Sequence, residues 1–221
     1  MRKLLALMPA VALLAGCNVL PQAAGQQRAT VQRSTSVITA RPETRQCLAT
    51  LSATQANFTP LPDQYYGAGC STLGTVRLAS LRSDEASLGL SNLGPVTCPL
   101  ASTFASWARF GVDRAAQQIL GSALVRIETM GSYNCRNVAG SARRSAHATA
   151  NAIDISAFVL ADGRRISIRG DWDRSGPSER RFLNAIHASA CKRFGTVLSP
   201  AYNAAHQDHL HLELSGRTFC R

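Results

Sequence analysis

Three of the five histidines in this chain lie within six positions near the C-terminus, at His206, His209 and His211. Alternating apolar residues follow His209, which indicates a strand. Side chains two apart on a strand point to the same face, so His209 and His211 would share one face. The opposite face would pack into the core through Leu210, Leu212 and Leu214.

A second stretch, Ser145 to Asp154, contains a histidine and a carboxylate seven residues apart, His147 and Asp154. Catalytic zinc takes three protein ligands from His, Asp, Glu or Cys and leaves one position for water. His147, Asp154 and His211 would supply such a set. Because zinc lowers the pKa of bound water to roughly 7, hydroxide becomes available at neutral pH for attack on an amide carbonyl. The sequence therefore predicts a Zn²⁺ centre with hydrolytic chemistry.

Hydrolysis at such a centre also needs a base and a group that stabilises developing charge. His209, on the same face as His211, could accept the proton or hold the oxyanion. His206 and Asp208 are alternatives for the base. Arg136, beside a cysteine, could clamp a substrate carboxylate or stabilise developing charge, because its guanidinium fork suits both tasks.

Apolar periodicity defines the elements that must position these residues. We expect helices over about 99–120, ended by Gly121, and over 178–194, with His187 structural or exposed on the second. The prolines and glycines of residues 60–69 indicate a loop. Strands are expected at 75–81, 123–130, 153–159, 165–168, 195–198 and 210–214. This pattern predicts an α+β fold, a small antiparallel sheet flanked by helices and stapled by disulfides.

The N-terminus has the features of an export signal. Two basic residues precede an apolar run, Leu4 to Leu14, which has the length of a signal-peptide core and is too short to span a bilayer. Leu14-Ala15-Gly16-Cys17 has the pattern of a bacterial lipoprotein box, with cleavage before Cys17 and acylation of that cysteine. Residues 1–16 would then be a lipoprotein signal peptide. Asn18 favours sorting to the outer membrane, on the periplasmic side of the envelope.

Six further cysteines form an even set, which favours three disulfides in an exported chain. We expect each cysteine to pair with its neighbour in sequence, because every bridge would then staple one local segment. The expected pairs are Cys47 with Cys70, Cys98 with Cys135, and Cys191 with Cys220. A zinc site built from these cysteines is the alternative, but no C-x-x-C spacing supports it.

Length and composition indicate a single domain behind the leader. Residues 17–46 are polar and poor in large apolar side chains, so we expect an acylated flexible tether, with the folded domain at 47–221. The net charge is +11 and comes almost wholly from arginine. A basic surface attracts anionic partners, which for an exported protein means cell-wall polymers or lipid head groups. No interleaving of basic and aromatic residues indicates a nucleic-acid groove.

The histidine motifs resemble a known group of enzymes. Ser145-x-His147, Ala152-x-Asp154 and His209-x-His211 resemble the LAS zinc peptidases, which include D-alanyl-D-alanine carboxypeptidases and murein endopeptidases. A closer resemblance is to the bacterial extensin-like C-terminal domain family, which is related to that group, and it covers roughly residues 47–220. The segments that carry it are Ser132-Tyr133-Asn134-Cys135-Arg136, Ala152-Ile153-Asp154-Ile155, Tyr202-Asn203-Ala204-Ala205-His206 and Asp208-His209-Leu210-His211-Leu212.

The resemblance implies a LAS-type fold in which His147, Asp154 and His211 bind zinc and His209 lies in the site. It implies a cell-envelope peptidase that hydrolyses an amide bond in peptidoglycan stem peptides, as a D,D-carboxypeptidase or an endopeptidase. We assign Ser145, the first residue of its motif, to substrate binding together with Arg136.

One residue departs from the peptidase pattern. Where S-x-H-x-x-G-x-A-x-D has glycine, this chain has Ala150. If that glycine permits a positive φ or close approach of the substrate, alanine would weaken turnover without removing a ligand. The alternative function is therefore a zinc-containing, peptidoglycan-binding envelope lipoprotein with little or no activity. A third hypothesis is a disulfide-built envelope protein whose histidines bind no metal.

Overall fold

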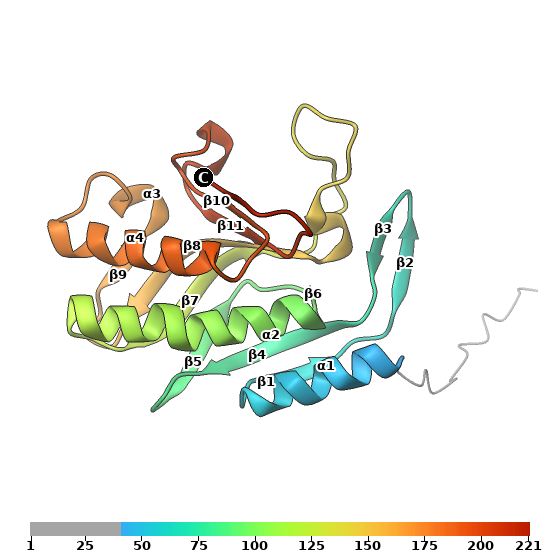
Figure 1. Ribbon diagram of the computed structural model, residues 1–221, viewed down its shortest axis with the longest axis horizontal. Helices are drawn as coiled ribbons and strands as arrows, with labels where there is room; N and C mark the ends of the chain where they lie inside the picture. The colour runs from blue at the N-terminus through green and yellow to red at the C-terminus, as the bar shows by residue number, and fades with distance from the viewer. Residues whose placement is uncertain (1–40) are drawn as a thin grey trace, which may run out of the picture. The chain divides into compact units, whose positions relative to one another are not determined.

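Ten strands of one sheet carry the fold, which we describe from a computed structural model over residues 41–221 (Figure 1). In spatial order eight of them are β1 (Asn57–Pro60), β4 (Thr75–Arg82), β5 (Ser87–Ser91), β7 (Leu124–Gly131), β8 (Ala152–Leu160), β11 (Leu210–Glu213), β10 (Thr196–Leu198) and β12 (Phe219–Cys220). The short strands β6 (Val96–Thr97) and β9 (Arg165–Ser167) pair with β4 and β8. The expected signal peptide, residues 1–16, and the acylated Cys17 lie outside the described residues.

The sheet is larger than expected and is mixed. Strand β5 pairs with β7 in parallel, β10 pairs with β12 in parallel, and the other pairs are antiparallel. The α+β class is thus confirmed, whereas a small, purely antiparallel sheet is not what forms. The two parallel pairs were not predicted from the sequence, because the relative direction of paired strands depends on how distant segments are connected.

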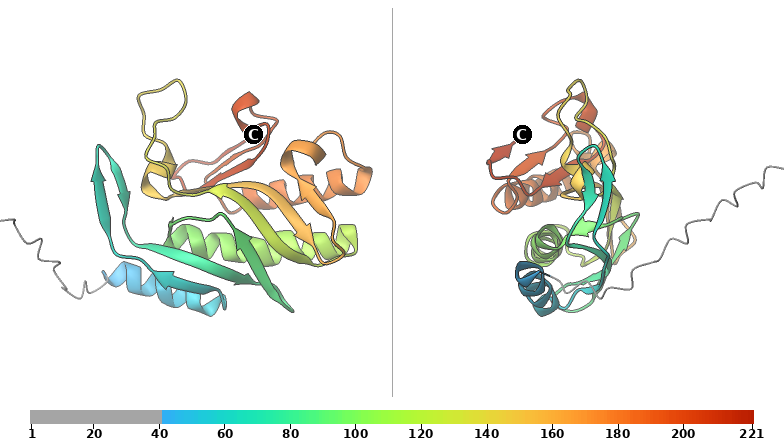
Figure 2. Two further views of the ribbon diagram at one scale, coloured as in Figure 1. Left: turned by 180° about the vertical axis from the view of Figure 1, so that it is seen from behind. Right: turned by 90° about the vertical axis from the view of Figure 1, so that its right-hand side faces the viewer.

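Helices cover one face of the sheet. The α-helices are α1 (Pro42–Ala53), α2 (Cys98–Trp107), α3 (Ile168–Asp171) and α4 (Pro177–Cys191). Figure 2 shows α1, α2 and α4 on the same side of the strands, and from behind the opposite face of the sheet lies in front of them. No helix within residues 41–221 has both the length and the hydropathy needed to cross a bilayer.

The expected helix at 99–120 is confirmed, with altered geometry in its second half. Helix α2 continues through two π-helical stretches, η1 (Ala108–Asp113) and η2 (Ala116–Leu120). It ends at Gly121 in the left-handed conformation with φ 69°, which glycine adopts without steric cost. Trp107 is fully buried, and its indole nitrogen donates to the carbonyl of Ile186 on α4 at 3.2 Å.

Gly111 marks the close approach between this helical run and α4. A Cβ there would lie 2.5 Å from Ser189 Oγ and 2.8 Å from Trp107 Cδ1. We expect Gly111→Ala to lower the free energy of unfolding by about 1–3 kcal/mol, the usual cost of overpacking. Urea denaturation measures it. Adding Ser189→Ala removes the nearest atom and should restore part of the loss, and equal stability of Gly111→Ala and wild type would refute this packing.

All six expected cysteines form disulfides, but two of the expected pairings are wrong. The bridges join Cys47 with Cys98, Cys70 with Cys135, and Cys191 with Cys220, so only the last pair is confirmed. The first bridge links α1 to the start of α2, which pack together. The second ties a hairpin to the segment before the candidate site. Both reflect tertiary neighbours far apart in sequence.

The segment expected to be a loop at 60–69 contains most of that hairpin, formed by β2 (Gln64–Gly67) and β3 (Cys70–Thr72). Its turn is the run Gly67, Ala68 and Gly69, all with positive φ. Strand β2 is exposed along its length, so its sequence lacks the alternation of apolar and polar residues that predicts a strand. The folded part also starts earlier than expected, because α1 begins at Pro42 and takes in residues 42–46 of the predicted tether.

Candidate metal centre

Strands β8 and β11 place one carboxylate and one imidazole directly opposite each other. In their antiparallel register, His211 is the partner of Asp154. Ile153 and Ile155 on either side of Asp154 are fully buried in the core. Because side chains alternate along a strand, Asp154 projects from the other face. The predicted histidine strand thus delivers His211 to Asp154.

A tight turn ahead of β8 brings His147 to the same place. The turn is the 3₁₀ helix η3 (Ala146–Thr149), and the hydroxyl of Ser145 accepts a hydrogen bond from the His147 backbone N–H at 3.3 Å. Ser145 is itself buried. This capping bond is a structural task for Ser145, and its predicted contact with substrate stays a prediction.

The ligand atoms of His147, Asp154 and His211 converge. His147 Nε2 lies 3.1 Å from Asp154 Oδ2 and 3.2 Å from His211 Nδ1, and His211 Nδ1 lies 2.9 Å from Asp154 Oδ1. Bonds of ~2.0–2.2 Å at tetrahedral angles would place ligand atoms about 3.3–3.6 Å apart. The three separations are a few tenths of an ångström shorter, and the two that involve Asp154 go to different oxygens. These residues therefore form a group that could hold a metal ion.

The outer nitrogens of both histidines are occupied, which fixes the nitrogens left for a metal. His147 Nδ1 donates to the carbonyl of Ser132 at 2.7 Å, leaving the Nε2 lone pair free. His211 Nε2 donates to the carboxylate of Glu213 at 3.4 Å, leaving Nδ1. Metal-binding histidines nearly always donate their other N–H to such an oxygen. The two free nitrogens are the pair that face each other and Asp154.

The local charges favour a cation at this point. In the metal-free protein, burial would raise the pKa of Asp154, but protons on His147 Nε2 and His211 Nδ1 that bond its carboxylate outweigh burial and hold the pKa well below its usual value. Burial would lower the pKa of His211, yet its bonds to Asp154 and Glu213 raise it to about 9. Two carboxylates thus favour a positive charge next to His211 Nδ1, and a metal ion bound there would take the place of the Nδ1 proton.

His209 lies beside this cluster and is oriented by Asp208. Its Nδ1 donates to Asp208 Oδ1 at 2.9 Å, and its Nε2 lies 3.6 Å from Asp154 Oδ1. His209 Nε2 therefore lies next to the three candidate ligands while Asp208 holds the ring. The structure brings both predicted residues to the site, with Asp208 behind His209.

His206 lies beside the site histidines, and Arg136 lies on the exposed segment that leads to the His147 turn. His206 ends the 3₁₀ helix η4 (Ala204–His206), and its ring centroid is 5.0 Å from that of His209. Burial, then the nearby charges of His209, His211 and Arg136, lower the pKa of His206 to about 4. Arg136 is exposed and so can meet a ligand from solvent. Its charge is one of those that lower the pKa of His206.

Residues 45–221 match the protein family described as extensin-like protein C-terminus. The chain belongs to this family. No curated protein and no solved structure matches the chain. The expected membership is thus confirmed, and kinship of the extensin-like domain with zinc peptidases stays a prediction.

The backbone of the extensin-like domain is left-handed at Ala150, the position where the peptidase motif has glycine. Ala150 has φ 55° and ψ 26°, ends η3, and is fully buried. Alanine therefore adopts the conformation that glycine would favour, and its methyl group lies inside the protein.

Ala150→Gly is accordingly expected to raise the free energy of unfolding by about 0.5–1 kcal/mol. Relief of the left-handed conformation, roughly 1–2 kcal/mol, exceeds the about 0.4–1 kcal/mol that glycine adds in unfolded-chain entropy. Urea denaturation measures the change, and zinc content should equal that of wild type. A loss of stability beyond about 1 kcal/mol would show that packing of the buried methyl outweighs backbone strain.

The one remaining histidine among residues 41–221 of the extensin-like chain, His187, lies near the sulfur atoms of two cysteines. His187 Nε2 is 3.9 Å from Cys191 Sγ and 3.7 Å from Cys220 Sγ, and its ring packs edge-on against Trp172. These cysteines are joined in a disulfide, so they offer no thiolates to a metal. His187 lies apart from the site, as predicted, and it is partly buried.

Three residues that support the site were not found from the sequence. Glu213 lies two residues beyond His211, so the strand period could have revealed it. Asn151 donates to the carbonyl of Leu214 at 2.6 Å, which ties the turn that carries His147 to the end of β11. Ser132 acts through its backbone carbonyl, for which side-chain patterns carry no signal.

Proposed function

We propose that the domain is a zinc peptidase of the cell envelope that hydrolyses an amide bond in peptidoglycan stem peptides. The observation that carries the proposal is the convergence of His147 Nε2, an Asp154 oxygen and His211 Nδ1, with the outer nitrogens already bonded. Three such ligands with one open position are the donor set of catalytic zinc. The motif resemblance to LAS peptidases supports the same reading and a related fold.

Each neighbouring residue has a task in this proposal. His147, Asp154 and His211 would hold the zinc, which when bound would supply a water of lowered pKa and a Lewis acid for the amide carbonyl. His209 Nε2 accepts a proton and later returns it to the leaving amine, while Asp208 holds the ring and stabilises the imidazolium. Arg136 binds a carboxylate of the substrate.

The basic composition fits an acidic polymer as partner. The chain has 24 Lys and Arg against 13 Asp and Glu, and peptidoglycan peptides carry carboxylates. We further propose an exported lipoprotein on the periplasmic side of the outer membrane, anchored through an acylated Cys17, and without a nucleic-acid partner. The sequence features at the N-terminus support this placement.

Incubation of zinc-loaded protein with purified muropeptides tests the activity. We expect products whose masses differ by loss of D-alanine or by cleavage of a crosslink. Their formation should slow strongly with His209→Ala and stop with His211→Ala. Tight binding of muropeptides without products would instead establish the inactive binding lipoprotein. Protein that takes up no zinc after metal repletion would leave only a disulfide-built structural role.

The conformation of Ala150 is compatible with turnover in this proposal. Alanine adopts a positive φ of 55° at this position, and its methyl group is fully buried inside the protein.

A further inference from the structure

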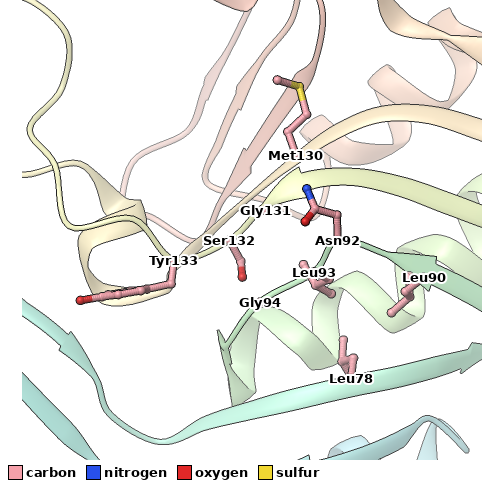
Figure 3. Close-up of a pocket in the computed structure, with 9 residues that line it drawn as sticks. All are labelled: Leu78, Leu90, Asn92, Leu93, Gly94, Met130, Gly131, Ser132 and Tyr133. Carbon is pink, nitrogen blue, oxygen red and sulfur yellow. The ribbon is translucent and has the colours of Figure 1, made fainter.

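A hollow of about 450 Å³ opens on the sheet next to the metal centre (Figure 3). Its apolar part is formed by Leu78, Leu90 and Leu93, and its polar part includes Asn92 and Ser132. This volume falls within the usual ~300–1,000 Å³ of ligand sites. No charged residue is among those that line it.

The hollow and the metal centre share the segment at the end of β7. Gly131 lines the hollow and is the register partner of Asp154. The hydroxyl of Ser132 donates to the carbonyl of Pro95 on the hollow side, while its own carbonyl accepts from His147. A peptide whose amide reaches the metal centre can therefore place a neighbouring side chain in the hollow.

Asn92 supplies a free hydrogen-bonding group at the rim. It is exposed and has φ 57°, a left-handed conformation that asparagine tolerates better than most residues. Its side chain extends towards Gly131, whereas that of Met130 points away (Figure 3). Within the described part of the chain its amide makes no hydrogen bond. The amide offers both a donor and an acceptor to a ligand.

We propose that this hollow binds the side chain of a diamino dicarboxylic acid in the stem peptide, beside the amide that is cleaved. The leucines would contact its methylene groups. The Asn92 carbonyl would accept from the terminal ammonium, and the Asn92 N–H would donate to the terminal carboxylate. Such an end group is neutral overall, which suits a lining without charges. The inference rests on the proposed function, because it names the substrate residue read by the same site.

Asn92→Gly is the sharpest test, since glycine keeps the left-handed backbone and removes the short side chain that carries the amide. Two tripeptides are compared, one with a diamino dicarboxylic acid and one with norleucine at the same position. Calorimetry on the full chain after zinc depletion measures both dissociation constants without hydrolysis. Wild type should bind the first peptide about tenfold more tightly, as expected for hydrogen bonds to charged groups. Asn92→Gly should bring that ratio to about one.

Leu93→Ala is the companion variant, and it should weaken both peptides to the same extent while keeping their ratio. Equal binding of the two peptides by wild type, or an unchanged ratio in Asn92→Gly, would overturn the inference even if zinc-loaded protein hydrolyses muropeptides. A tenfold preference that depends on Asn92, in a protein without hydrolytic activity, would support the subsite and refute the peptidase. Thermal melting confirms that the variants remain folded.

Discussion

Asp154→Asn should abolish hydrolysis and most zinc binding while leaving the fold intact. Asp154 supplies the only anionic ligand in the cluster, and its two oxygens lie 3.1 and 2.9 Å from the histidine nitrogens. An amide of the same shape keeps the β8 strand pairing but loses the charge. Since outer partners of metal ligands alone are worth ~10–100-fold in affinity, we expect at least about a 100-fold loss of zinc affinity. Hydrolysis should fall by ~10³ or more.

Competition with a fluorescent chelator measures the zinc affinity, and elemental analysis gives the zinc content. Asp162→Asn is the matched control, because Asp162 lies on an exposed turn and bonds Arg164. That variant should keep wild-type zinc content and hydrolysis. If Asp154→Asn bound zinc as tightly as Asp162→Asn, the assigned ligand set would be wrong.

His209→Ala should lower kcat by ~10²–10⁴ while zinc content stays at the wild-type level. The reason is that His209 Nε2 points to the cluster from 3.6 Å but is not one of its three ligands. Asp208→Asn should cost less, about tenfold, because Asp208 acts by holding the ring.

Variants of two other histidines serve as controls for the effect of His209→Ala on kcat. His187→Ala should leave kcat unchanged, since His187 packs beside the Cys191–Cys220 disulfide. His206→Ala tests the alternative base. A large fall in kcat with His206→Ala, together with full activity of His209→Ala, would transfer the role of base to His206.

The heart of the candidate site could be predicted because its residues follow local rules. His209 and His211 alternate with leucines, two of which, Leu210 and Leu212, are fully buried. The Asp154 strand has the same alternation. The strand period of two therefore predicts which side chains face the core and which face the site, without knowledge of which strands pair.

Features that depend on distant contacts were not predictable in the same way. The pairing of Cys47 with Cys98 follows from packing of α1 against α2, and that of Cys70 with Cys135 from the position of an exposed hairpin. The orientation of His147 depends on the carbonyl of Ser132, which every residue type possesses. Neither composition nor hydrophobic periodicity indicates which distant residues will become such partners.

Anomalous diffraction at the zinc edge, on crystals of zinc-loaded protein, tests the central claim most directly. The account predicts one strong peak within ~2.0–2.2 Å of His147 Nε2, an Asp154 oxygen and His211 Nδ1. A peak elsewhere, or none at this cluster in protein that still hydrolyses muropeptides, would contradict it.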